Sequence, residues 1–319
     1  MNRNTSTRAL VESGLMTALT VVLMLGAYYL PLLGYVAMFL WPLPIAMLYV
    51  RHGIKYSLLA LIASGLVMGM MSGFATALSM MLGFGLASII MGYCATHKKP
   101  AYLTIVMMGV AIFIGVLVML KAYSLVWGQD IITMTIETFN QSIESVKELY
   151  ASMNVPKETI NTVLNAIDTS KLVMIMPIAL AGSSLIMAFI SYTIAGKLFK
   201  RFGYEMDPVK PFSEWYLPKA MVFVITLIVI LSYIAYNAKW NMAESYFNNS
   251  YLAFVYMFMV NGLCALDFFL KKKALPKAVR VIICILCVVT GLSTILMFIG
   301  LLDNALNLRK LDKTRIKRV

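Results

Sequence analysis

The sequence is poor in charged residues, which fill only 13% of its 319 positions, whereas about 25% is usual in a soluble domain. Acidic residues are the scarcest: 14 Asp and Glu stand against 27 Lys and Arg, for a net charge of +13. The hydrophobic fraction is 61%, against roughly 45–50% in ordinary domains. This composition excludes a soluble domain and predicts an all-α polytopic membrane protein. The positive charge is then expected in cytoplasmic loops, and no nucleic-acid partner is predicted.

The sequence also lacks the motifs of common catalytic and metal sites. Its four cysteines lie within or at the ends of apolar runs, and Cys284-x-x-Cys287 has no His or carboxylate near it, so we expect no disulfide framework and no metal site. It contains no G-x-x-x-x-G-K-[ST] and no G-x-S-x-G motif. No acidic pair, His relay or Arg series lies in the middle of an apolar run. We therefore predict no enzyme, no cofactor and no ion-coupled pump.

Hydrophobic segments account for most of the chain. They cover residues 9–30, 35–50, 56–71, 74–93, 101–127, 172–195, 217–236, 251–270 and 281–302. The first is too long for the apolar part of a signal peptide and is expected to be a retained span. The second contains Trp41-Pro42-Leu43-Pro44, which predicts a kink. The sequence thus predicts eight or nine membrane segments in the cell membrane.

The basic residues indicate which side each loop faces. If the N-terminus is cytoplasmic, 16 basic residues fall in inner loops and five fall outside through the eighth segment, as the positive-inside rule requires. A ninth crossing would break the rule, because residues 309–318 carry six more basic side chains. Either 281–302 enters and returns, with Gly291 and Ser293 near its middle, or it crosses and leaves the tail outside. We favour a cytoplasmic tail, although a re-entrant segment needs its backbone buried in protein.

One polar insertion, residues 128–170, is predicted to lie outside, and it is acidic. Apolar residues recur in it with the spacing 4-3-4-3-4-3, at Ile132, Ile136, Phe139, Ile143, Val146, Tyr150 and Met153. This pattern predicts an amphipathic helix, and the residues after Pro156 add a second, shorter apolar face. The insertion is expected to be an extracytoplasmic helical hairpin packed on the spans, a lid over an outward-facing pocket, or a dimer-forming coiled coil.

Small residues mark two helix faces that predict close contact in lipid. Gly65, Gly69 and Gly73 recur every four residues and are expected to pack inside the helix bundle. Gly14 and Ala18 have the same spacing on the first segment, where a partner protein is an equal alternative. A third surface consists of Lys271, Lys272 and Lys273, which follow an apolar run and are expected to face anionic lipid. An Asp267–Lys271 pair, one helical turn apart, is expected beside them.

The order of these features resembles the YybS family of bacterial membrane proteins. The resemblance rests on residues 7–18, the turn at Pro31, Trp41-Pro42-Leu43-Pro44, Arg51-His52-Gly53, Pro177, Tyr192, Lys200-Arg201-Phe202-Gly203 and Gly300-Leu301-Leu302-Asp303. The first six helices of that family are in turn similar to S-components of energy-coupling-factor transporters. The resemblance divides the chain into a six-helix core (1–203, with the insertion 128–170), a cytoplasmic linker (204–216), C-terminal membrane segments (217–302) and a basic tail (303–319).

S-components bind a small solute near the outer face and dock on a membrane coupling subunit, so the resemblance implies both properties here. Their docking face is A-x-x-x-A, and Gly14-x-x-x-Ala18 stands in its place. The candidate ligand and lid residues are Trp41, Tyr192, Phe139 and Ile143. The core is poor in polar groups, so an apolar or amphipathic solute is expected. The alternative is a non-transporting scaffold for envelope assembly, comparable with the rod-shape factor MreD.

Overall fold

A computed structural model describes residues 3–30, 33–128, 130–153 and 169–311, and these residues form helices and no strand. The chain divides into two compact units, Met1–Val209 and Lys210–Val319. Eight helical stretches of the described residues are long and apolar enough to cross a membrane. They are Thr7–Tyr29, Gly34–His52, Ile54–Ser72, Phe74–Thr96, Ala101–Leu125, Leu172–Arg201, Lys219–Asn237 and Ala243–Lys272. The prediction of an all-α polytopic membrane protein is confirmed.

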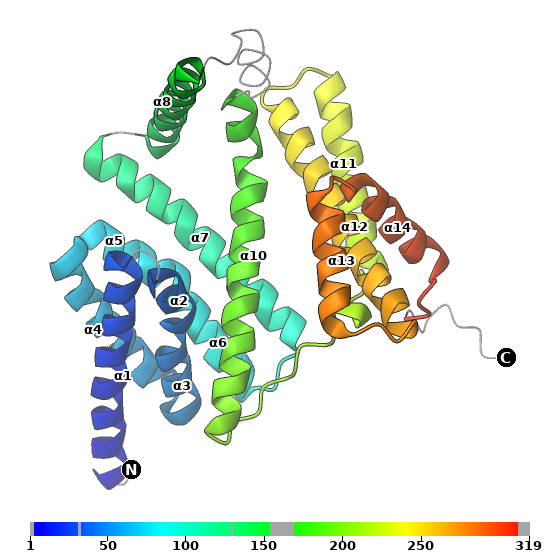
Figure 1. Cartoon of the computed structure of the whole chain (residues 1–319). Coiled ribbons are helices and arrows are strands. Elements are labelled where there is room, and N and C mark those ends of the chain that lie inside the picture. Colours follow the sequence, from blue (N-terminus) through cyan, green and yellow to red (C-terminus); the bar gives the residue numbers. More distant parts are fainter. Residues whose placement is uncertain (1–2, 31–32, 129, 154–168, 312–319) are drawn as a thin grey trace. The chain divides into compact units, whose positions relative to one another are not determined.

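The helices of the first unit run from blue to green in Figure 1. They are α1 (Arg3–Tyr29), α2 (Leu33–Leu40), α3 (Pro42–His52), α4 (Ile54–Ser72), α5 (Phe74–Met80), the π-helical turn η1 (Met81–Gly85), α6 (Leu86–Thr96), α7 (Ala101–Trp127), α8 (Ile131–Ser152) and α10 (Thr169–Arg201). The break between α2 and α3 falls at Trp41, because the prolines that follow it suit a helix start and not a helix interior.

The core of the first unit is built from large apolar side chains that come from most of its membrane helices. It includes Met24, Trp41, Met68, Met91, Met108, Tyr192 and Phe199, all almost completely buried. Two glycines bring η1 and α7 into backbone contact, since a Cβ on Gly115 would overlap the backbone of Gly83. The π-helical turn and the absence of side chains at these two positions let the helices cross more closely than other residues allow.

The second unit contains the 3-10 turn η2 (Phe212–Glu214), α11 (Lys219–Asn237), α12 (Ala243–Lys272), α13 (Lys277–Val289) and α14 (Ser293–Leu306). α11 and α12 pack side by side, and a hydrogen bond of 2.7 Å joins the hydroxyls of Ser232 and Ser250. α12 makes its largest contact with α14. Gly262 and Gly300 lie at this crossing, where a Cβ on either would overlap the other helix's backbone.

The expected ninth segment is two helices, α13 and α14, bent by 116°. Gly291 lies at the bend with φ +76°. α13 begins just after the C-terminal end of α12. Near the end of α14, Asn304 Nδ2 donates a hydrogen bond of 2.9 Å to the carbonyl of Leu217, a residue just before the start of α11. Because neighbouring α11 and α12 run in opposite directions, both points lie at the same end of the unit. The pair α13–α14 therefore starts and finishes at the same end of the unit, which favours the first of the two alternatives that the charge pattern left open.

Candidate functional site

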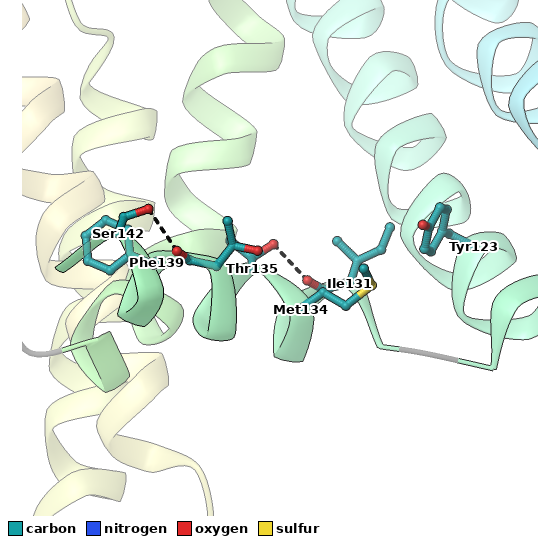
Figure 2. A pocket seen from close by; sticks show the side chains of 7 residues that line it. Tyr123, Ile131, Met134, Thr135, Phe139 and Ser142 are labelled. Carbon is teal, nitrogen blue, oxygen red and sulfur yellow. Dashed lines mark hydrogen bonds between the residues drawn. The ribbon is translucent and has the colours of Figure 1, made fainter. Parts of the chain in front are cut away.

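A groove of about 470 Å³ lies between the C-terminal end of α7 and the first turns of α8. Its lining residues, shown in Figure 2, are Tyr123, Ile131, Met134, Thr135, Thr138, Phe139 and Ser142. α8 begins with a cap in which the Asp130 carboxylate accepts a hydrogen bond of 3.1 Å from the amide of Ile132. The heptad pattern of the insertion thus correctly predicted the helix that forms one wall.

The chemistry of this groove is apolar with a few hydroxyl groups. Thr135 donates to the carbonyl of Ile131 at 2.7 Å, and Ser142 donates to the carbonyl of Thr138 at 2.9 Å, within α8 (Figure 2). Their oxygens keep lone pairs that can accept a hydrogen bond. No charged residue is among those that line the groove. Such walls suit a small apolar or amphipathic molecule better than an ion.

The four predicted ligand and lid residues lie in two separate places. Phe139 lines the groove, and Ile143 is half-buried one turn further along α8. Trp41 and Tyr192 belong to the core of the first unit and are not among the described residues that line the groove. Tyr192 donates a hydrogen bond of 2.7 Å to the carbonyl of Asp207, so its hydroxyl holds the chain that follows α10.

The small-residue face of α1 is uncovered. Gly14 and Ala18 are both exposed, and a Cβ on Gly14 would meet no atom within 4 Å. They lie on one helical face with Val11, Leu15 and Val22, which are all about 60% exposed. This face has no protein neighbour among the described residues, so it is available to lipid or to another membrane helix.

The second small-residue series is covered, as expected of a packing face. A Cβ on Gly65 would overlap the Met81 side chain, and one on Gly69 would lie 3.7 Å from the Ala77 Cβ. Gly73 differs from the other two glycines, because it lies in the turn between α4 and α5 with a φ of +87°. A side chain at that φ is strained, so glycine is required there for conformation.

One acidic side chain fixes α1 to α3. Glu12 accepts a hydrogen bond from the ring Nε2 of His52 at 2.8 Å and one from Arg51 Nη1 at 3.3 Å. Arg8 lies 3.3 Å from the same carboxylate, one helical turn before it. The guanidinium of Arg51 also lies over the ring of Phe202, 5.4 Å from its centroid. This ion cluster positions the helix that carries the exposed Gly14–Ala18 face.

A buried polar cluster in the second unit was missed by sequence reasoning. Asp303 accepts hydrogen bonds from the Nε and Nη2 of Arg309, at 3.0 and 2.8 Å. Arg309 also donates to the side-chain oxygen of Asn261 at 2.8 Å and to the carbonyls of Ser213 and Trp215, at 3.0 and 2.8 Å. The sequence predicts Arg309 in an exposed basic tail, because its neighbours in sequence give no sign that it is buried.

The expected partner of Asp267 is also different. Its carboxylate pairs with Arg280 Nη1 at 2.7 Å, across the turn between α12 and α13. The sequence prediction of an Asp267–Lys271 pair is wrong, because the α13 start brings a guanidinium closer than the flexible ammonium one turn away. Among the described residues, no three His, Cys, Asp or Glu side chains gather in a way that could hold a metal ion.

Comparison with known proteins identifies a family to which this sequence is similar. The model of one family, described as predicted membrane protein (DUF2232), matches residues 18–304. The chain belongs to the DUF2232 family. It is also 27% identical over 314 residues to a protein of Bacillus subtilis (strain 168) described as uncharacterized protein YybS, an alignment that covers 95% of this chain and 98% of that protein. No solved structure matches. The resemblance to the YybS family is therefore confirmed.

The extent of the DUF2232 match locates the candidate sites within the family. Its range includes the α7–α8 groove, the α12–α14 crossing and Asp303. Gly14 lies before the match begins, and Arg309 lies after it ends. The DUF2232 description supports a multi-pass membrane protein and names no solute or partner, so both belong to the proposal that follows.

Proposed function

We propose that this protein is a subunit of a membrane transporter that resembles an S-component. It holds a small apolar or amphipathic solute in the α7–α8 groove and docks on another membrane subunit through α1. In this proposal the N-terminus is cytoplasmic, the groove lies at the outer face of the cell membrane, and the chain has no catalytic role.

The observation that carries the proposal is the groove itself. Its volume of about 470 Å³ lies within the range of roughly 300–1,000 Å³ that is usual for small-molecule sites. Its position follows from α7, which has 27 residues and begins beside Lys98 and Lys99. A helix of that length rises about 40 Å, which supports a position for the groove near Tyr123 on the side of the membrane opposite those two lysines.

The uncovered face of α1 supports the docking part of the proposal. In lipid, two helices associate where small residues let their backbones approach. Gly14 and Ala18 provide such a shallow notch between the exposed side chains of Leu15 and Val22. The cluster of Glu12 with Arg51 and His52 holds α1 against α3 and leaves this notch turned outward.

An alternative is a non-transporting scaffold for envelope assembly. The groove is open along one side, which suits a partner segment as well as a solute. The same α1 notch would then hold an envelope-assembly protein. The two functions differ in one observable property, because only the transporter-type subunit retains a small molecule in the groove.

The experiment compares three forms of the purified full-length protein. Thr138→Trp fills the groove, and Thr133→Trp places the same bulk on the opposite, exposed face of α8. Each protein is extracted with organic solvent, and the extract is examined by untargeted mass spectrometry. We expect a compound that the wild type and Thr133→Trp retain and that Thr138→Trp retains at least tenfold less. Equal retention of every compound by all three proteins would contradict solute binding and favour the scaffold.

A further inference from the structure

A second hollow, of about 290 Å³, lies in the second unit at the C-terminal end of α12. Its lining residues are Ser213, Glu214, Phe268, Lys271 and Lys272. One wall is η2, and the other is the last turn of α12, which packs against η2. The hollow therefore combines two ammonium groups, one carboxylate, one hydroxyl and one aromatic ring.

The two lysines are not neutralised within the protein. Both are exposed, and neither makes an ion pair with any described residue. Asp267, the carboxylate one turn before Lys271, is engaged by Arg280 at 2.7 Å. Glu214 supplies a single negative charge to the lining, so the hollow has a net positive charge and attracts an anion.

The wall opposite the lysines is held in place by buried groups. Arg309 Nη1 donates to the carbonyls on either side of Glu214, those of Ser213 and Trp215. The Trp215 indole donates to the carbonyl of Lys210 at 2.9 Å, and its ring lies edge-on to Phe212, with centroids 5.3 Å apart. The hollow is thus formed in advance, which lowers the entropy cost of binding.

The place of the hollow selects the kind of anion. α12 is a membrane-spanning helix that ends at Lys272, and lysines at such ends lie at the level of lipid headgroups. Phe268 lies one helical turn before Lys272 on α12, where the acyl chains of a bound lipid are expected. We propose that the hollow binds the headgroup of an anionic glycerophospholipid, with Lys271 and Lys272 on the phosphate oxygens. A headgroup hydroxyl donates to the Glu214 carboxylate, which makes phosphatidylglycerol the matching class.

This site is separate from the α7–α8 groove and does not depend on the proposed function. It sharpens the prediction of an anionic-lipid surface at Lys271–Lys273. Lys271 and Lys272 line the hollow, whereas Lys273 is not among its lining residues.

The test uses native mass spectrometry of the full-length protein in detergent, with phosphatidylglycerol, phosphatidylcholine or inorganic phosphate added. The wild type is expected to bind phosphatidylglycerol at least tenfold more tightly than phosphatidylcholine, and inorganic phosphate at equal concentration is expected not to displace it. Similar binding of both lipids would overturn the proposal. Displacement by inorganic phosphate would also overturn it and would indicate a site for a soluble anion.

A variant pair locates the site. Lys271→Gln/Lys272→Gln is expected to weaken phosphatidylglycerol binding at least tenfold. The control, Lys98→Gln/Lys99→Gln, removes the same charge from two adjacent exposed lysines outside the hollow and is expected to change binding less than twofold. Equal loss in both variants, or loss in neither, would overturn the assignment to the hollow. Gel filtration checks that each variant is folded, and the comparison of lipids on the wild type needs no variant.

Discussion

Asp303 and Arg309 form an ion pair whose side chains are each 1% exposed. Such a pair seldom adds net stability, because both charges lose their hydration. Here the hydrogen bonds of Arg309 reach three parts of the second unit: Asn261 on α12, the carbonyls of Ser213 and Trp215 at η2, and Asp303 near the end of α14. The cluster therefore ties the end of α14 to α12 and η2, and its loss should be costly.

The first prediction concerns this ion pair. Arg309→Met leaves the Asp303 carboxylate buried without its cation, which costs about 3–5 kcal/mol, so we expect a clearly lower midpoint of thermal unfolding in detergent. The double variant Arg309→Met/Asp303→Asn removes the unpaired charge and should recover part of the loss. Lys310→Met, next in sequence and exposed, is the control and should leave the midpoint unchanged. An unchanged midpoint in Arg309→Met would contradict the role assigned to the pair.

Residue partners were the least predictable part of this sequence. The notch at Gly14 and Ala18 was found from spacing alone, since small residues four apart share a helical face. The partner of Asp267 was not predicted correctly. Arg280 reaches Asp267 across the turn between α12 and α13, and no local sequence pattern indicates the path of that turn. Arg309 was missed for the same reason: its burial depends on how α14 returns toward η2.

At the level of the helices, the crossing of α12 and α14 depends on two glycines. A methyl group on Gly300 would overlap the carbonyl of Phe258. The second prediction is that Gly300→Ala lowers the thermal midpoint, because overpacking of this kind costs about 1–3 kcal/mol. Gly182→Ala is the matched control, since open space surrounds Gly182 and Ala favours a helix by about 1 kcal/mol over Gly. Equal thermal midpoints for Gly300→Ala and Gly182→Ala would contradict this prediction, because they would show that α12 and α14 can move apart without a loss of stability.

The third prediction tests the return of α14 in the membrane. In a protein freed of its four cysteines, single cysteines replace Lys273, Lys310 or Lys239, and intact cells are treated with a membrane-impermeant maleimide. Lys273 and Lys310 should react alike, because α13–α14 enters and returns, whereas Lys239 at the far end of α11 should react differently. If Lys310 labels like Lys239, the bent pair crosses the membrane and the re-entrant assignment is wrong.

The sequence predicted helices well where a long apolar segment or a regular spacing of apolar residues marks them. The eight spans and α8 followed from apolar runs and a heptad pattern, because lipid allows no unpaired backbone. The π-helical turn inside Phe74–Thr96 and the bend at Gly291 depend on tertiary packing. For the bend, the charge pattern allows two paths of the chain, and the hydrogen bond from Asn304 to the carbonyl of Leu217 favours the path that returns.

Considered as a whole, the chain is a multi-pass membrane protein of the DUF2232 family with two compact units. Most of the hydrophobic residues, 61% of the sequence, lie in membrane helices, and the polar insertion 128–170 contributes α8 to the groove. Membership of the family supports the architecture, and function still has to be argued from the sites.

The most direct test of the central claim, that this chain acts as a subunit docked through α1, is photo-crosslinking in intact cells. A benzophenone amino acid replaces Leu15, which is 66% exposed beside the notch, or Ile186, which is 62% exposed on α10 and is the control. We predict one discrete crosslinked membrane protein from position 15 and none from position 186. Adding Gly14→Leu/Ala18→Leu should lower the yield from position 15 at least fivefold. No crosslink from position 15, or an undiminished yield with both leucines present, would contradict the claim.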